Sequence, residues 1–587
     1  MKVVLSGNEA IARGFYEAGG EFASAYPGTP STEILENIGQ YREIQAQWAP
    51  NEKVALEVTA GAGLGGMRSL AAMKHVGLNV AADPFFSLSY QGVNAGVIIV
   101  SADDPSMHSS QNEQDNRWFA RAAKVPMLEP SDSTEARDFV KAALEISEQY
   151  DAPVLLRTTT RINHSKCVVE LRDRVSVERK SYTKNMPKNV LLPGNARKRH
   201  VVVEEHLRQL IEFGNSSRLN QIEWGDKTIG IITSGIAYQY AKEVFPNASI
   251  LKLGMTNPLP KQLIQNFARQ VEKIYLIEEL DPFLEEQIAA MGISVEGKNR
   301  LPVIGELSPS IIADAFVPTN TSAQTSVIAD VPIPARTPVL CPGCSHRGIF
   351  YALKKLKLTV TGDIGCYTLA AIPPLEMMDT CLCMGASVGY AHGMQKATGD
   401  ERKGKIIGVI GDSTFLHSGI TGLIDLVYND STAKICILDN HITAMTGHQE
   451  NPGSGLNLRR EPATKIDLEA ICHAAGIKRV VKVDPYKLDE TIKTLRAEMA
   501  VEEPAVIIAD APCIIRARIK FSEPYYADAD TCIACGMCHR VGCPAIEKNE
   551  AGKTKINPLL CIGCDICRQV CKPGAIRRRT SDVKSET

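Results

Sequence analysis

The sequence lacks a long apolar run, a marked excess of either charge and any low-complexity tract. No apolar stretch approaches the roughly 20 residues that cross a bilayer. The apolar start Val3-Val-Leu5 is too short for the apolar region of a signal peptide. The net charge is −2, which gives no reason to expect binding to nucleic acid or to an anionic membrane. We therefore expect a cytoplasmic protein with neither a nucleic-acid partner nor a membrane partner.

The composition is that of an ordinary globular protein, with 44% hydrophobic and 22% charged residues. A chain of 587 residues predicts about three to five domains. The 17 cysteines come without any export feature, so they indicate a reducing compartment rather than a disulfide framework.

Eight cysteines lie close together near the C-terminus, in two C-x2-C-x2-C runs that are each followed by a fourth cysteine. They are Cys532, Cys535, Cys538 and Cys543, then Cys561, Cys564, Cys567 and Cys571. This spacing is typical of a bacterial-type ferredoxin module with two [4Fe–4S] clusters, which carries single electrons. A zinc ribbon would leave the third cysteine of each run unused, and disulfides do not suit a reducing compartment.

In two-cluster ferredoxins the fourth cysteine of each run ligates the other cluster. Applied to this sequence, the rule assigns Cys571 to the first run and Cys543 to the second. Two departures affect the loops but remove no ligand. Four residues separate Cys538 from Cys543, and Lys572 precedes the proline that normally follows the last cysteine.

Strand-like apolar runs alternate with helix-like segments through most of the chain, a pattern that predicts α/β domains with parallel sheets. Composition shifts suggest the boundaries. We expect α/β domains at 1–165, 227–316 and 339–515, a linker or irregular segment at 166–226, a linker at 317–338, and the ferredoxin-like module at 516–587.

Two predicted strands in the third α/β domain end in polar residues. Lys405–Ile410 leads into Gly411-Asp412-Ser413, and Ala433–Leu438 leads into Asp439-Asn440. Open α/β sheets bind ligands at the carboxyl ends of their strands. A carboxylate, an amide oxygen and a backbone carbonyl suit Mg²⁺, and a helix N-terminus suits a pyrophosphate. The pattern favours a site for magnesium and a diphosphate.

This arrangement resembles the thiamine diphosphate motif, G-D-G followed after a strand–helix–strand interval by N-N. The resemblance implies that Asp412 and Asn440 bind Mg²⁺ through their side chains and Ile442 through its backbone carbonyl. It places Gly411 and Ser413 beside the cofactor. Ser413 and Asp439 depart from the motif, although neither is an implied side-chain ligand.

A thiamine motif upstream of a ferredoxin module resembles the 2-oxoacid:ferredoxin oxidoreductases. The stretches that carry this resemblance are Tyr26-Pro-Gly-Thr-Pro-Ser31, Glu57 with the small-residue run Ala60–Gly66, Cys341-Pro-Gly-Cys344-Ser-His346 and Gly362-Asp-Ile-Gly-Cys366. Three further stretches look like the large subunit of the arylpyruvate-oxidising members: Asn51–Glu57, Lys74–Asn79 and Asp103–Asn112.

The resemblance implies a fold and roles for residues. Residues 1–165 and 339–515 would be the pyrimidine-side and diphosphate-side thiamine-binding domains, and 227–316 a transketolase-C-like domain. Glu57 would activate the cofactor, with Glu52 as its rival, and Thr29 would lie near the substrate. The cofactor would be lined by Cys344, His346 and Cys366.

The implied reaction is oxidative decarboxylation of an arylpyruvate such as indolepyruvate. The thiamine carbanion attacks the keto carbon, carbon dioxide leaves, and coenzyme A takes the acyl group as co-substrate. The products are an arylacetyl-CoA and reduced external ferredoxin. The family also uses a further domain that this sequence lacks, so we expect a smaller β subunit in a heterodimer or an α2β2 assembly.

Several alternatives stay open at the level of sequence. The chain could act on pyruvate or 2-oxoglutarate, or be an electron-transfer subunit with a vestigial thiamine fold, although intact Asp412 and Asn440 argue against the latter. A non-oxidative thiamine decarboxylase would not need the eight cysteines. Cys341, Cys344 and His346 could form a metal site but have no obvious fourth ligand. The polar loop 103–117, which contains His108, Ser109 and Arg117, could bind the substrate carboxylate or simply be solvated.

Overall fold

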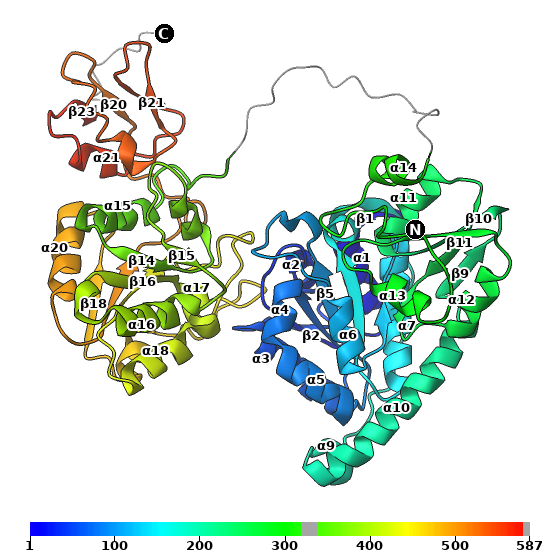
Figure 1. The fold of residues 1–587 in the computed structure, drawn as a ribbon. Coiled ribbons are helices and arrows are strands. Elements are labelled where there is room, and N and C mark those ends of the chain that lie inside the picture. Colours follow the sequence, from blue (N-terminus) through cyan, green and yellow to red (C-terminus); the bar gives the residue numbers. More distant parts are fainter. Residues whose placement is uncertain (318–336, 579–587) are drawn as a thin grey trace. The chain divides into compact units, whose positions relative to one another are not determined.

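The computed structural model describes residues 1–317 and 337–578 and divides into two compact units, Met1–Val331 and Pro332–Thr587 (Figure 1). Each unit contains a parallel β-sheet with helices around it, as the alternating pattern predicts. The predicted linker at 317–338 lies almost entirely outside the described residues. Within the described ranges, no helix has both the length and the apolar character needed to cross a membrane.

The first unit is built on a seven-stranded sheet. Its strand order is β12 (Met255–Asn257), β6 (Met127–Leu128), β7 (Val154–Thr159), β5 (Val97–Asp103), β4 (Ser69–Lys74), β2 (Phe22–Ala25) and β3 (Gln45–Trp48). All neighbours are parallel except β12, which runs antiparallel to β6. The central strands β4, β5 and β7 are buried along their whole length. This explains why they read as unbroken apolar runs.

Three of the helices around this sheet begin at side-chain capping residues. Ser6 and Glu9 form a capping box at α1, Asn51 caps α3, and Asp132 caps α7. The helices around this sheet are α1 (Gly7–Glu17), α2 (Thr32–Ile38), α3 (Glu52–Leu64), α4 (His75–Val80), α5 (Ala82–Gln91), α6 (Arg117–Ala123), α7 (Ser133–Gln149) and α8 (Thr160–His164).

A four-stranded sheet completes the first unit. Its order is β13 (Lys273–Ile277), β10 (Asp226–Ser234), β11 (Ala248–Leu253) and β9 (Asn220–Glu223), with only β9 antiparallel. Its helices are α11 (Gly235–Val244), α12 (Lys261–Ala268), α13 (Phe283–Ala289) and α14 (Pro309–Phe316). One hydrophobic core contains residues from both sheets, among them Ile99 and Leu251.

The expected linker or irregular segment at 166–226 is wrong in part, because much of it is regular structure. Strand β8 (Lys166–Glu170) pairs antiparallel with β1 (Lys2–Ser6). Helices α9 (Met186–Asn189) and α10 (Pro193–Ser216) follow, and β9 ends the segment. Helix α10 has 24 residues but buries only Val203, Leu210 and Gly214. Such a narrow apolar stripe leaves little periodic signal in the sequence.

The second unit contains a six-stranded, all-parallel sheet. Its order is β15 (Thr380–Cys381), β14 (Thr359–Gly362), β16 (Ile406–Gly411), β17 (Lys434–Asp439), β19 (Ala505–Asp510) and β18 (Arg479–Val483). Its helices are α15 (His346–Leu356), α16 (Ala386–Thr398), α17 (Asp412–Thr414), α18 (Ile420–Tyr428), α19 (Leu468–Ala474) and α20 (Leu488–Met499).

The cysteine-rich segment forms the end of the second unit, coloured orange to red in Figure 1. It contains two short antiparallel hairpins and helix α21 (Ile566–Gln569). The hairpins pair β20 (Tyr525–Ala527) with β23 (Ile576–Arg578) and β21 (Ile546–Lys548) with β22 (Thr554–Ile556). Its apolar residues, Val541 and Ile566 among them, belong to the same hydrophobic core as Ile349 of α15 and Leu495 of α20. The cysteine-rich module therefore packs on the α/β domain and shares its hydrophobic core.

Candidate active site and thiol groups

The polar residues that follow β16 and β17 lie at one edge of the second sheet. The two strands are parallel neighbours, and Gly411 pairs in register with Leu438. Asp412 therefore begins α17 beside the turn that carries Asp439 and Asn440. The Asn440 side-chain oxygen accepts a hydrogen bond from the backbone nitrogen of Ile442 at 3.2 Å, which folds this turn back on itself.

Asp412 is buried, with 3% exposure, and its surroundings are short of positive charge. Burial and the neighbouring Asp439 raise the pKa of Asp412 to about 7. Its Oδ2 accepts a hydrogen bond from the Asn451 side chain at 3.2 Å, a contact that the sequence did not suggest. A buried carboxylate with a carboxylate neighbour is a fitting ligand for a divalent cation, which would hold it in the charged form.

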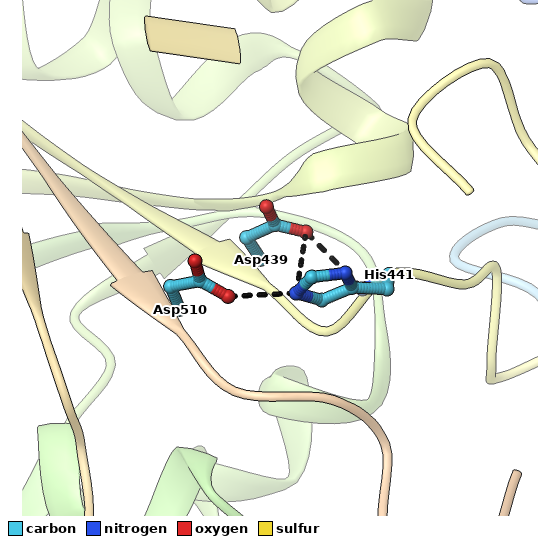
Figure 2. A group of neighbouring side chains, drawn as sticks. All are labelled: Asp439, His441 and Asp510. Carbon is cyan, nitrogen blue, oxygen red and sulfur yellow. Dashed lines mark hydrogen bonds and ion pairs between the residues drawn. The ribbon is translucent and has the colours of Figure 1, made fainter. Parts of the chain in front are cut away.

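Next to this carboxylate lies a group of two aspartates and a histidine (Figure 2). Asp439 and Asp510 end the neighbouring strands β17 and β19 and pair in register. The His441 Nε2 lies 2.7 Å from Asp510 Oδ1 and 3.9 Å from Asp439 Oδ1. The imidazole therefore lies beside two carboxylates at the same edge of the sheet as Asp412, and nearby His441 lowers the pKa of Asp412 in opposition to burial.

Two contacts order the rest of this edge. The Thr443 hydroxyl donates to the Ser413 hydroxyl at 2.8 Å. The Thr414 hydroxyl donates to the backbone oxygen of Ile364 at 3.0 Å, which brings the Gly362–Cys366 loop to the start of α17. Gly411 lies so close to the Tyr367 ring that an added Cβ would be 2.8 Å from it. Glycine is required there by a close approach rather than by its backbone angles.

The structure brings Cys344 and Cys366 together with two further cysteines, Cys341 and Cys513. Each of the thiols Cys341, Cys344 and Cys366 has at least two others of this group as electrostatic neighbours. Burial first, and then the neighbouring thiolates, raise the pKa of Cys344 to about 12 and that of Cys366 to about 11. The sequence grouped Cys341 and Cys344 with His346 and offered no fourth ligand, whereas the structure gives these two thiols Cys366 and Cys513 as electrostatic neighbours.

His346, the remaining member of the predicted turn, starts α15 and is buried. Burial and the adjacent Arg347 lower its pKa to about 4, so the imidazole is neutral at pH 7. Its ring packs edge-on against Tyr367, with the centroids 5.9 Å apart. A hydrogen bond with the His346 backbone lowers the pKa of Cys344, so this residue contacts the thiol group through its main chain while its ring packs on Tyr367.

Six of the eight cysteines of the two runs are near neighbours within the cysteine-rich module: Cys538, Cys543, Cys561, Cys564, Cys567 and Cys571. Cys543 is an electrostatic neighbour of Cys564 and Cys567, and so is Cys561. Cys538 of the first run has Cys571 as a neighbour. The fourth cysteine of each run thus lies with the other run, as the rule for two-cluster ferredoxins predicts. Both groups pack against the hydrophobic core of the second unit.

The two kinds of thiol group adjoin one another. Gly343, between Cys341 and Cys344, has a φ of +68°, and an added Cβ would lie 2.3 Å from Ile562 and 3.5 Å from Cys564 Cβ. The Tyr486 hydroxyl donates to the Gly343 oxygen at 2.9 Å. The turn at 341–344 therefore packs directly on the second cysteine run.

In the first unit, the loop that contains Thr29 lies over the end of β4. Gly28 packs on the Lys74 side chain, and an added Cβ would lie 3.1 Å from Lys74 Cβ. The Lys74 amine donates to the Ser109 backbone oxygen at 2.5 Å, and the Ser109 hydroxyl donates to the Thr29 backbone oxygen at 3.4 Å. Three loops that follow β2, β4 and β5 thus meet at one place.

Lys74 is a buried cation, with 9% exposure. Burial lowers its pKa to about 8, against the opposing effect of Asp104. Among the described residues no carboxylate forms an ion pair with this amine, which donates to the backbone oxygen and to the hydroxyl of Ser109. The sequence does not reveal Lys74 as a site residue, because it is the last residue of an apolar strand.

The two candidate glutamates of α3 have opposite surroundings. Glu57 is exposed on the outer face of the helix and forms an ion pair with Lys53, one turn earlier. Glu52 lies in the first turn, is buried, and packs against Gly77, where an added Cβ would be 2.7 Å from its carboxylate. Within this unit, the burial expected of Glu57 is found at Glu52.

The loop 103–117 contains one side chain that cannot bind a substrate from solution. Arg117 is buried between Asp115 at 2.5 Å and Glu278 at 2.6 Å. His108 lies 3.0 Å from Glu306. Ser109 alone of the three residues named in that loop contacts the Thr29 loop. Arg117 is therefore a structural residue that ties the two sheets of the first unit together.

Comparisons with known proteins agree with these features. Residues 363–509 match the family described as "Thiamine pyrophosphate enzyme, C-terminal TPP binding domain". Residues 13–213 match "Pyruvate flavodoxin/ferredoxin oxidoreductase, thiamine diP-bdg". Together with the α/β fold, these matches define a thiamine diphosphate-dependent oxidoreductase.

The full-length relatives are more specific. The indolepyruvate oxidoreductase subunit IorA of Archaeoglobus fulgidus is 40% identical, over 99% of this chain and 98% of its own length. That of Pyrococcus horikoshii is 39% identical over 98% and 97%. The chain belongs to the family of the indolepyruvate oxidoreductase subunit IorA.

More distant matches are partial. The 2-oxoglutarate synthase subunit KorA of Methanothermobacter thermautotrophicus is 27% identical over 37% of this chain and 58% of its own length. A solved structure of 2-oxoglutarate:ferredoxin oxidoreductase from Magnetococcus marinus is 17% identical, with a TM-score of 0.46 over 53% of this chain and 64% of that chain.

Proposed function

We propose that the chain catalyses the thiamine diphosphate-dependent oxidative decarboxylation of indolepyruvate or a related arylpyruvate, with coenzyme A as acyl acceptor and ferredoxin as electron acceptor. The observation that carries this proposal is that the Asp412 edge belongs to the sheet whose core is contacted by six cysteines of the two runs and by Cys344 and Cys366. The full-length likeness to indolepyruvate oxidoreductase subunits supports an arylpyruvate over 2-oxoglutarate, whose synthase subunit matches only part of the chain.

Magnesium and the diphosphate would be held at the carboxyl ends of β16 and β17. Asp412, Asn440 and the backbone oxygen of Ile442 supply oxygen ligands, and Gly411 and Ser413 line the turn. The buried carboxylate of Asp412 supports this assignment, because a cation would compensate its charge. When bound, thiamine diphosphate supplies a carbanion that attacks the keto carbon and takes up the electrons left when carbon dioxide departs.

The carboxylate that activates the cofactor would come from the start of α3. Glu57 is the residue that the family resemblance implies, but the burial of Glu52 supports Glu52 instead. A buried carboxylate exchanges a proton with a buried nitrogen more readily than one that already pairs with Lys53 in solvent. Thr29, in the loop after β2, stays a proposed substrate contact.

Lys74 is the cation in the first unit that best suits the substrate carboxylate. It lies beneath the Thr29 loop, retains its charge at pH 7, and has no carboxylate partner among the described residues. An ammonium that donates to a carboxylate makes one of the stronger hydrogen bonds in proteins. Lys74 would orient an arylpyruvate while the Ser109 loop covers it.

The cysteine runs would bind two [4Fe–4S] clusters, one through Cys532, Cys535, Cys538 and Cys571 and the other through Cys561, Cys564, Cys567 and Cys543. The group Cys341, Cys344, Cys366 and Cys513 would bind a third, since four converging thiols fit such a cluster and its contact with the second run suits electron transfer. When bound, these clusters supply one-electron transfer. Zinc is the alternative occupant of the third group.

The partners follow from the reaction and from the relatives. The matched proteins are named as subunits, which supports a smaller β subunit in a heterodimer or an α2β2 complex. An external ferredoxin would collect the electrons from the cysteine-rich module. Reduced thiol groups of this kind suit the cytoplasm.

The test is to purify the chain with its partner subunit without oxygen. Viologen reduction is then followed with indolepyruvate, phenylpyruvate, pyruvate and 2-oxoglutarate, with and without coenzyme A. We expect reduction with the aryl substrates, dependence on coenzyme A, and about twelve irons per chain from three four-iron clusters. Reduction with pyruvate or 2-oxoglutarate alone would support the sister activity, and an iron content near zero would reject the clusters.

A further inference from the structure

Arg347 is a buried cation that lies between two of the thiol groups. It is the second residue of α15 and is 2% exposed. On one side its Nε donates to the Cys341 oxygen at 3.1 Å, and an Nη group donates to the Leu340 oxygen. On the other side an Nη group donates to the Val541 oxygen at 3.3 Å and to the oxygen of Gly542, which precedes Cys543.

All these acceptors are neutral backbone carbonyls. Among the described residues no Asp or Glu forms an ion pair with Arg347, and after burial the largest influences on its pKa come from the neighbouring cysteines Cys543, Cys344, Cys341 and Cys564. A guanidinium buried without a negative partner is costly. By contrast, the buried Arg117 of the first unit has two carboxylate partners.

We propose that Arg347 is the shared counter-charge of two iron–sulfur clusters, the one held by Cys341, Cys344, Cys366 and Cys513 and the one held by Cys543, Cys561, Cys564 and Cys567. The inference rests on the proposed function. Arg347 itself would not be a ligand of either cluster. It donates hydrogen bonds to the backbone oxygen of Cys341, which is a ligand of one cluster, and to that of Gly542, which precedes a ligand of the other.

The positive charge of Arg347 should raise the reduction potentials of the two adjacent clusters. A four-iron cluster with four thiolate ligands is anionic, and reduction adds one more negative charge. A fixed positive charge beside it stabilises the reduced form more than the oxidised form. Because the interior is poorly screened, one buried charge acts on both neighbouring clusters. Arg347 would therefore make the two adjacent clusters easier to reduce. It would not have this effect on the cluster held by Cys532, Cys535, Cys538 and Cys571.

The experiment uses the full chain with its partner subunit and titrates the clusters by electron paramagnetic resonance at set potentials. Arg347→Gln removes the charge and keeps amide donors, and Arg347→Lys keeps the charge and loses the planar fork. For Arg347→Gln we expect the equilibrium constant for reduction of both adjacent clusters to fall about tenfold, or about 59 mV for one electron. Arg347→Lys should retain most of the original potentials.

The cluster held by Cys532, Cys535, Cys538 and Cys571 is an internal reference whose potential should not move, and Arg540→Gln is the matched control because Arg540 is an exposed arginine of the same module. Iron content and the spectra of each variant show that the clusters are present before potentials are compared. Unchanged potentials in an iron-replete Arg347→Gln protein would overturn the proposal.

A variant that loses iron is replaced by Arg347→Met, whose stem has a similar length. If both uncharged variants lose one or both of the adjacent clusters while Arg347→Lys keeps them, the counter-charge role is supported. If Arg347→Lys loses them as well, the proposal fails, since the residue then serves packing alone.

The failure of this inference differs from failure of the proposed function. Absence of iron from the wild-type complex would refute the clusters themselves. Clusters that are present in the wild type with potentials indifferent to residue 347 would refute only the role of Arg347.

Discussion

The backbone nitrogen of Cys513 donates a hydrogen bond to the backbone oxygen of Asn440 at 3.0 Å. This single contact ties a proposed magnesium ligand to a cysteine of the third thiol group. One backbone hydrogen bond therefore fixes the position of the proposed cofactor site relative to the thiols that would receive its electrons.

Replacing Cys513 by alanine should remove the third cluster and leave the other two. The backbone hydrogen bond to Asn440 is retained, so thiamine binding should persist while iron per chain falls by about a third and viologen reduction is lost. Cys472→Ala is the control, since Cys472 is a buried cysteine of the same unit whose pKa is not affected by another cysteine. Full iron content in the Cys513→Ala protein would remove this residue from the ligand set.

Glu52→Gln should reduce turnover by 100-fold or more, because general acid–base groups contribute roughly that much. Glu57→Gln should keep most of the activity, since that side chain is exposed and pairs with Lys53. Both variants preserve size and helix propensity. Initial rates with indolepyruvate, compared with thiamine binding measured by fluorescence quenching, separate catalysis from cofactor affinity. The reverse order of effects would restore Glu57 as the activating residue.

Lys74→Met should raise KM for an arylpyruvate by about 10- to 100-fold, which corresponds to the loss of one hydrogen bond to a charged group. Binding of phenylpropionate and of its uncharged amide provides a readout without turnover. Wild-type protein should prefer the carboxylate, and the variant should not. Lys53→Met serves as the control because that lysine is on the outer face of α3.

The pH dependence of carboxylate binding offers a second check on Lys74. Its pKa is about 8, so the amine is charged at pH 7 and loses its proton as the pH rises through 8. Affinity for phenylpropionate should therefore be constant below pH 7 and fall above pH 8, while affinity for the amide stays flat. A carboxylate affinity that stays flat to pH 9 would argue against Lys74 as the partner.

Magnesium binding should depend on pH in the opposite direction. Asp412 has a pKa of about 7 without a cation, so bound Mg²⁺ must displace a proton at lower pH. Magnesium-dependent thiamine binding should weaken about tenfold from pH 8 to pH 6, with most of that change below pH 7, and change little above pH 8, as fluorescence quenching would measure. Asp412→Asn should abolish both the binding and this pH dependence. Equal affinity at pH 6 and pH 8 would show that Asp412 does not ligate the metal.

The parts of the fold that follow from local patterns were predictable. Strands β16 and β17 lie within one residue of their predicted positions, because an unbroken apolar run followed by a polar turn is typical of a buried parallel strand. Helix α10 was missed because its apolar stripe has few members. The sequence shows periodicity only where a wide face is buried.

Site residues that depend on tertiary structure were less accessible. Cys513 has no spacing signal because it reaches Cys341 through the sheet and not along the chain. The choice between Glu52 and Glu57 depends on which face of α3 is turned inward, and both residues lie in the same family-like stretch. Lys74 was hidden at the end of a fully buried strand. The cysteine runs were recognisable because their ligands are close in sequence.

The cysteine-rich module shares its hydrophobic core with α15 and α20. If oxygen destroyed the proposed clusters, the structural damage would therefore extend beyond the cysteine-rich module. Loss of iron would leave buried thiols and Arg347 uncompensated inside the same core that supports the sheet of the second unit. Proteases should therefore cleave the air-damaged protein more readily throughout the second unit. The cell would then remove the inactive thiamine site together with the damaged electron-transfer module.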